Sequence, residues 1–277
     1  MTDGYSLPDL PADLDMRLVV ADMDGTLLDD SGAVPDGFWP LLTAMRERGI
    51  AFAPASGRQC ATLGRLFERE LHGMPLIAEN GSYVVRDGAE VSSATIDREV
   101  VVGVVEAVRD AVADGYDLGV VVCGKRSAYI ERLDEAFRRE CDKYYAALTE
   151  VPDVLVPEDD VLKLAIFDFG SALDSAPLFE RFKVGHQVVV SGPNWIDIMC
   201  EGVNKGAAVR ALQAELGITR AQTVVFGDFF NDAEMLDEAD WSFAMANAHA
   251  DIRKRANYLA PPSSDAGVVT VLAHLLG

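Results

Sequence analysis

The chain has 277 residues, 49% of them hydrophobic and 25% charged, which excludes an intrinsically disordered protein and allows one large domain or two ordinary ones. Its formal net charge of −21 offers no basic surface to nucleic acid or to an anionic membrane, and no apolar run reaches the ~18 residues of a membrane span. An anionic substrate would therefore need local positive charge from Lys, Arg or a metal ion.

The cysteines and the N-terminus indicate the compartment. The four cysteines lie far apart without a CxxC pair, which predicts free thiols in a reducing cytoplasm: Cys60, Cys123, Cys141 and Cys200. Residues 1–5 lack the basic start and apolar run of a signal peptide. We expect a cytoplasmic monomer or weak homodimer that binds a small molecule and neither nucleic acid nor membrane.

Strands and helices alternate in the first part of the chain. Residues 17–21 form a β-branched run that predicts a buried strand ending at Asp22. A helical pattern follows over 35–49, then a second strand over 50–55 and a second helix over 58–71. This order predicts a doubly wound α/β sheet of the Rossmann-like, parallel kind.

The alternation returns late in the chain, with a helix at 206–216, a strand at 222–226, a short helix at 233–238 and a strand at 242–245. The segment between the two parts has a different, α+β pattern. Its helix-like stretches are 97–114, 134–147 and 174–183, and its strand-like stretches are 118–123, 162–167 and 186–190. We therefore expect a catalytic core formed by residues 1–87 and 199–277, with an inserted α+β cap domain at 88–198.

Two carboxylates follow the first strand. Asp22 and Asp24 stand two residues apart where a parallel sheet binds ligands, and they would repel each other unless a cation neutralised them. Oxygen ligands of this kind suit Mg²⁺. Alternatively, Asp24 and Gly25 form an ordinary turn.

Two further groups could attract an anion. Ser56 and Gly57 follow the second strand, where a hydroxyl and backbone amides at a helix N-terminus bind anions. Lys205 opens the later helix, at an end that also attracts anions. The alternatives are a simple serine cap and a solvated surface lysine.

The loop after the late strand at 222–226 brings Asp228, Asn231 and Asp232, of which the last two could instead cap the following helix. Because each of the four groups follows a core strand or opens a core helix, we expect a single crevice to gather them. Carboxylates, a hydroxyl and a lysine in one crevice are typical of metal-assisted phosphoryl transfer.

The ordered set resembles the haloacid dehalogenase superfamily, specifically its Cof-like phosphatases with a C2B-type cap. The similarity spans about residues 17 to 272. Its four motifs are Asp22-Met23-Asp24-Gly25-Thr26, Ser56, Lys205 and the stretch from Gly227 to Asp232. Three further signatures agree: Glu79-Asn80-Gly81, Ala244-Met245-Ala246-Asn247-Ala248 and Asp265-Ala266-Gly267-Val268.

This resemblance implies Mg²⁺-dependent hydrolysis of a small phosphorylated metabolite, such as a sugar phosphate, through an aspartyl-phosphate intermediate. Asp22 would be the nucleophile and Asp24 the general acid and base, while Lys205 and Ser56 would neutralise phosphate oxygens. The implied metal-binding residues are Asp22, Asp24 (through its main-chain carbonyl), Asp228 and Asp232, the last orienting Lys205 or a metal-bound water. Further substrate contacts are expected from Gly25, Thr26, Gly57 and Asn231.

Three other functions share part of this pattern. A phosphomutase of the same superfamily would return the phosphoryl group to its substrate, and the four motifs hardly separate it from a hydrolase, although the three further signatures favour the hydrolase. A phospho-accepting signalling module has no inserted cap and lacks the second aspartate. A catalytically inactive binding protein is disfavoured because no motif residue is lost.

The sequence leaves the substrate open. Specificity is expected from the cap, which carries ten more acidic than basic residues, with the turn at 124–126 as one candidate place. Phe229 and Phe230 stand where smaller or polar residues are common in the family, and we expect them to narrow the entrance.

Overall fold

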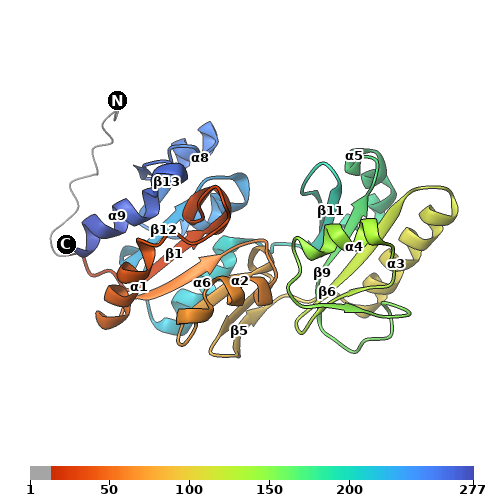
Figure 1. Ribbon diagram of the computed structural model, residues 1–277, viewed down its shortest axis with the longest axis horizontal. Helices are drawn as coiled ribbons and strands as arrows, with labels where there is room; N and C mark the ends of the chain where they lie inside the picture. Colours follow the sequence, from red (N-terminus) through yellow and green to blue (C-terminus); the bar gives the residue numbers. More distant parts are fainter. Residues whose placement is uncertain (1–13) are drawn as a thin grey trace. The chain divides into compact units, whose positions relative to one another are not determined.

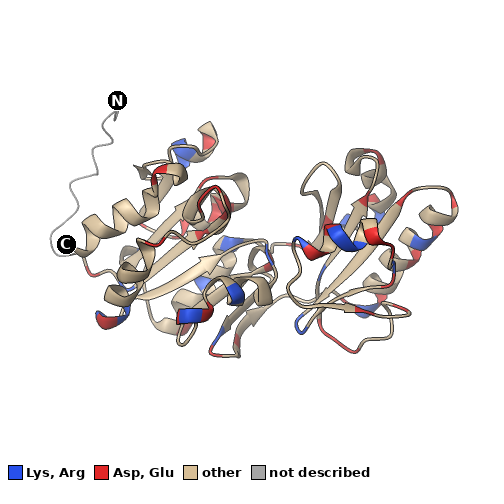
Figure 2. Ribbon diagram, in the orientation of Figure 1, with Lys and Arg blue, Asp and Glu red and all other residues tan. Residues whose placement is uncertain are grey.

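The computed structural model describes residues 14–277, so the expectation about residues 1–5 lies outside it. The chain divides into two compact units (Figure 1). The core unit takes in residues 14–57, 66–92 and 204–277 of the described chain, and the inserted unit takes in residues 58–65 and 93–203. Acidic positions are spread over both units, in keeping with the net charge (Figure 2).

The core unit contains an eight-stranded sheet in the order β14-β13-β12-β1-β2-β3-β4-β5. Its parallel strands are β1 (Leu18–Asp22), β2 (Ala51–Ala55), β3 (Pro75–Ala78), β12 (Thr223–Gly227), β13 (Trp241–Met245) and β14 (Tyr258–Ala260). The edge is completed by β4 (Tyr83–Arg86), antiparallel to β3, and by β5 (Ala89–Ser93). Strand β1 is buried along its whole length, as expected of a central strand covered on both faces.

The core helices are α1 (Phe38–Glu47), α6 (Lys205–Leu216), α7 (Ala233–Asp237), α8 (Ala250–Arg255) and α9 (Gly267–Leu276). Helix α1 contacts α9, and α6 contacts α7. Helix α6 ends where Gly217 adopts a left-handed conformation (φ 65°), which glycine tolerates without steric cost. The predicted doubly wound α/β core is confirmed.

The inserted unit is built on a six-stranded sheet in the order β10-β11-β9-β6-β7-β8. Its strands are β6 (Leu118–Gly124), β7 (Ala128–Ile130), β8 (Leu148–Glu150), β9 (Val161–Asp168), β10 (His186–Val190) and β11 (Trp195–Cys200). All neighbours pair antiparallel except β7 and β8. One apolar cluster joins the sheet to α3 (Arg98–Ala113), and another joins it to α4 (Glu135–Asp142). The α+β character expected of the insertion is confirmed.

Two helical stretches of the inserted unit differ from their prediction. The helix expected over 134–147 ends at Asp142. The backbone beyond it bonds instead to the side chains of Thr62, in α2 (Cys60–Leu66), and of Gln59, which precedes α2. Thr62 donates to the Tyr144 carbonyl, and Gln59 both donates to and accepts from the Ala147 backbone. The stretch at 174–183 is mostly a 3-10 helix (Ala176–Lys183) with proline in its first turn.

All four cysteines are free thiols, with Cys123 and Cys141 buried. Burial raises the pKa of the Cys141 thiol to about 12, so this thiol stays protonated at neutral pH. Among the described helices, none has the length and apolar character needed to cross a bilayer.

Candidate active site

Parallel strands in register bring the predicted motifs to one edge of the core sheet. Strand β1 ends at Asp22, which pairs with Ala55, the last residue of β2, and its Ala21 pairs with Phe226 of β12. The residues that follow these three strands therefore emerge side by side at the carboxyl edge. Ser56 and Asp228 are the first residues beyond β2 and β12.

Lys205 lies at the centre of this edge and is completely buried. Its ammonium donates a hydrogen bond to Asp22 Oδ1 and another, of 2.6 Å, to Asp232 Oδ1. Burial alone would lower the pKa of Lys205, but the two carboxylates raise it above its ordinary value. The lysine is therefore a permanent positive charge inside the site, and the alternative of a solvated surface lysine is wrong.

Asp232 organises the loop after β12. Its Oδ2 accepts hydrogen bonds from the backbone amides of Asp228 (2.9 Å) and Phe229 (3.1 Å), while its Oδ1 holds Lys205. Gly227 allows this arrangement, since a Cβ there would lie 2.6 Å from the Asp232 Cβ. Asp232 thus connects Lys205 to the loop that carries Asp228.

Asp228 is held by the loop that follows β1. Its Oδ1 accepts a hydrogen bond of 3.0 Å from Thr26 Oγ1. Its Oδ2 lies over Gly25, where an added Cβ would approach to 2.5 Å and where the backbone is left-handed (φ 78°). Gly25 and Thr26 therefore support a carboxylate, and their expected contacts with substrate stay predictions.

The structure brings together three carboxylates that could hold a cation. One oxygen from each of Asp22, Asp228 and Asp232 lies within 4.8 Å of the others, the one such grouping among residues 14–277. Burial raises the pKa of Asp22 well above its ordinary value, and the charge of Asp232 adds to this shift, although Lys205 opposes it. Burial and the charge of Asp232 also raise the pKa of Asp228, to about 6.

Three carboxylates gathered around one lysine carry more negative charge than Lys205 neutralises. Hard oxygen donors at this spacing fit a divalent cation such as Mg²⁺, which would relieve the repulsion. The side chain of Asp24 does not belong to the group, and it is exposed. Its expected contribution, through the main-chain carbonyl, remains a prediction.

The phosphate-binding residues predicted after β2 lie beside a tight turn. Ser56 is buried, and its backbone amide donates to the Ile77 carbonyl at 2.9 Å. Asn231 is exposed and donates through Nδ2 to Asn80 Oδ1 at 3.2 Å. Of the two residues that could instead cap the following helix, Asp232 occupies the N-cap position of α7, and its carboxylate accepts the bonds from the loop amides.

Two asparagines without a predicted role support the site. Asn247 donates to the Gly25 carbonyl at 2.8 Å and accepts from the Ser263 amide at 2.9 Å, so it ties the loop after β1 to the loop before α9. Asn80 contacts Asn231. Both belong to the secondary signatures noted in the sequence, and those signatures were the signal that could have pointed to them.

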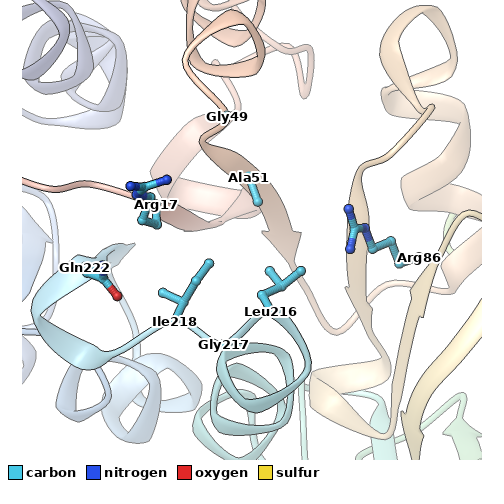
Figure 3. A pocket seen from close by; sticks show the side chains of 8 residues that line it. All are labelled: Arg17, Gly49, Ala51, Arg86, Leu216, Gly217, Ile218 and Gln222. Atoms are coloured by element: carbon cyan, nitrogen blue, oxygen red, sulfur yellow. The ribbon is translucent and has the colours of Figure 1, made fainter.

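A separate cavity of about 280 Å³ lies at the amino ends of the strands, near the start of β1 and β2 (Figure 3). Arg17, Arg86 and Ile218 are among its lining residues. Asp15 pairs with Arg17 at 2.6 Å, which neutralises that guanidinium. None of the carboxylates described above lines this cavity, and we assign it no part in catalysis.

Comparison with known proteins identifies the family. A family model described as a haloacid dehalogenase-like hydrolase matches residues 19–272. The chain is 32% identical over 272 residues to a 5-amino-6-(5-phospho-D-ribitylamino)uracil phosphatase of Escherichia coli, covering 95% of this chain and 97% of that protein. It is 27% identical over 237 residues to an HMP-PP phosphatase of Cronobacter sakazakii, covering 84% and 85%.

The fold agrees with solved structures. A haloacid dehalogenase-like hydrolase from Bacteroides thetaiotaomicron superposes with a TM-score of 0.83 at 24% identity, covering 94% of this chain and 99% of that one. The family model and the relative from Escherichia coli confirm the family predicted from the four motifs. The chain belongs to the haloacid dehalogenase-like hydrolases and is one of the phosphatases of that family.

Proposed function

We propose that the protein is a Mg²⁺-dependent phosphatase that hydrolyses a small phosphorylated metabolite through a phospho-aspartate at Asp22. The observation that carries the proposal is the burial of Lys205 between Asp22 and Asp232, beside Asp228, at the carboxyl edge of the sheet. Such a site offers a carboxylate nucleophile, a fixed positive charge and oxygen ligands for a cation within a few ångströms.

The metal would be held by Asp22, Asp228 and the main-chain carbonyl of Asp24, with Asp232 acting through water. When bound, Mg²⁺ would neutralise charge on the transferring phosphoryl group. Lys205 would supply further positive charge to the phosphate oxygens, and Ser56 would donate a hydrogen bond to them. The hydrogen bond from Lys205 also orients the Asp22 carboxylate for attack.

In the first step, an oxygen of Asp22 would attack phosphorus and form an acyl phosphate while the ester P–O bond breaks. Asp24 would protonate the departing alkoxide. In the second step, Asp24 would take a proton from water, which attacks the phosphorus of the acyl phosphate and releases inorganic phosphate and the free Asp22 carboxylate. Asp24 is exposed, which suits a group that exchanges protons with leaving alcohol and water.

We also propose that the inserted α+β domain, placed by the sequence at 88–198, determines substrate specificity, and that the protein works in the reducing cytoplasm as a monomer or weak dimer. Four free thiols support the second point.

The most specific substrate candidate comes from the relatives. One acts by name on 5-amino-6-(5-phospho-D-ribitylamino)uracil, and another on HMP-PP. In this chain, Phe229 and Phe230 follow Asp228 with side chains that are 56% and 50% exposed. Their rings meet edge to face at 5.2 Å, and His249 lies 4.5 Å from the second ring. We propose that this aromatic surface contacts a planar ring in the alcohol part of the substrate.

Metal binding can be tested without turnover. Saturating Mg²⁺ should raise the thermal stability of the wild-type protein, because a ligand at a hundred times its Kd stabilises the folded state by about 2.7 kcal/mol. In Asp228→Asn the rise should be lost, since one ligand and its charge are removed. Glu215→Gln, which changes an exposed carboxylate near the end of α6, is the matched control and should keep it. An undiminished rise in Asp228→Asn would place the ion elsewhere.

The acid role of Asp24 can be tested with two leaving groups. A sugar alkoxide needs a proton as the P–O bond breaks, whereas a nitrophenolate hardly does. Asp24→Asn should therefore slow alcohol release from a sugar phosphate by about 10²–10⁴-fold in a single turnover. It should slow nitrophenol release from p-nitrophenyl phosphate much less. Equal slowing of both substrates, with the Mg²⁺ response intact, would leave Asp24 only an orienting role.

The substrate proposal predicts a ring-dependent effect. The wild-type protein should have a higher kcat/KM for 5-amino-6-(5-phospho-D-ribitylamino)uracil than for ring-free sugar phosphates. Phe230→Ala should lower kcat/KM for the ring-bearing ester by about fivefold or more, the value of one stacked ring, and leave the sugar phosphates unchanged. Leu259→Ala, at another exposed apolar residue of the core unit, should affect neither. An equal loss on both substrate types would argue against ring recognition.

A further inference from the structure

We propose that Asn80 is a positioning residue: through its turn and its carboxamide it fixes the loops that carry Ser56, Asn231 and Lys205. The turn is the short segment Glu79–Gly81 between β3 and β4. The inference rests on the proposed function, because it takes these loops to be the ones that hold the phosphate ester.

The backbone of this turn is held in an uncommon conformation. Glu79, Asn80 and Gly81 are all left-handed, with φ of 50°, 54° and 99°. A side chain with a Cβ is disfavoured there, although asparagine tolerates the region better than most residues. Such conformations persist where the surroundings fix them, and they concentrate at ligand-binding sites.

The first contact of the turn is with the loop after β2. The Asn80 amide donates to the Ser56 carbonyl at 2.9 Å, and the Ser56 amide donates to the Ile77 carbonyl at the same distance. The backbone of Ser56 is thus bonded on both sides, by β3 and by the turn. A shift of the turn would therefore move the Ser56 hydroxyl.

The carboxamide of Asn80 makes the second set of contacts. Its Oδ1 accepts from Asn231 Nδ2 at 3.2 Å, which links the turn to the loop after β12. Its Nδ2 lies 2.9 Å from the position that a Cβ on Gly57 would take, so the carboxamide occupies the space left by that glycine. One side chain thereby spans two loops that the chain separates by more than a hundred residues.

The third contact is with the start of α6. A Cβ on Gly81 would lie 2.5 Å from the carbonyl oxygen of Asn204, the residue before Lys205. The turn therefore packs against the backbone from which Lys205 projects. Glycine accepts a left-handed backbone without steric cost, so replacing Asn80 by glycine removes the carboxamide and leaves the turn unstrained.

The experiment compares Asn80→Gly, Asn231→Ala and the double variant. Asn80→Gly should raise KM for the substrate and Ki for inorganic phosphate in parallel by about three- to tenfold, the range for one neutral hydrogen bond, with kcat nearly constant. The Mg²⁺-dependent thermal stabilisation should stay at the wild-type value, since no proposed ligand of the ion is changed. KM and Ki of the double variant should be no higher than those of the more impaired single variant, because both single substitutions break the same contact between Asn80 and Asn231.

Two further variants separate positioning from folding. Asn80→Gly should be at least as thermally stable as Asn80→Ala, because glycine accepts the left-handed backbone without cost. Asp87→Gly changes another left-handed residue (φ 50°), in the turn after β4, and should leave KM and Ki unchanged.

Wild-type KM and Ki in Asn80→Gly would overturn the inference. It would also be overturned if the fold-increase in KM of the double variant equalled the product of the increases in the two single variants. A raised KM combined with a lost Mg²⁺ response and a lower thermal stability would also overturn it, because this combination would show a structural role alone. If the wild-type protein itself releases no phosphate from any ester with Mg²⁺, it is the proposed function that fails. If the wild-type protein is active and Asn80→Gly has unchanged KM and Ki, only the inference about Asn80 fails.

Discussion

The site depends on one buried charge. Lys205 has no exposed surface, and its ammonium is satisfied by Asp22 and Asp232 from two different strand ends. Removing one partner of a buried ion pair costs about 3–5 kcal/mol, because the remaining charge is left without compensation. The folded core therefore requires these two carboxylates at these positions, and the same requirement places the proposed nucleophile, Asp22, beside a fixed positive charge. Folding and the proposed chemistry are coupled through this ion pair.

The carboxylates around Lys205 leave the site with an excess of negative charge. Two carboxylates face one lysine and exceed its charge by one, and Asp228 adds a third carboxylate that Thr26 and Gly25 hold in place. Burial and the neighbouring charge of Asp232 raise the pKa values of Asp22 and Asp228. In a chain with a net charge of −21, a cation is also the simplest means of admitting a phosphate ester. The electrostatics thus favour a metal-assisted reaction on grounds independent of the relatives.

The residues that meet at the carboxyl edge of the sheet could be predicted from the sequence, because the end of a strand is a local feature of the chain. Asp22, Ser56 and Asp228 each directly follow an apolar run, and parallel strands end at the same edge, so their meeting could be inferred. The contacts of Asn80 and Asn247 could not, because they depend on turns whose conformation is fixed by tertiary packing. The end of α4 at Asp142 was missed for the same reason: Thr62 and Gln59, far away in the chain, bond the backbone that would otherwise have continued the helix.

The proposed reaction passes through a phosphoryl group bound to Asp22, and trapping that group is the decisive test. The Asp24→Asn variant should accumulate the intermediate with p-nitrophenyl phosphate, because its first step needs little acid catalysis and its second step lacks the base. After acid quenching and digestion, mass spectrometry should find phosphate on the peptide that contains Asp22, and none when Asp22 is also changed to Asn. Phosphate on another residue, or nitrophenol release with no phosphorylated Asp22 at any time, would show that Asp22 is not the nucleophile.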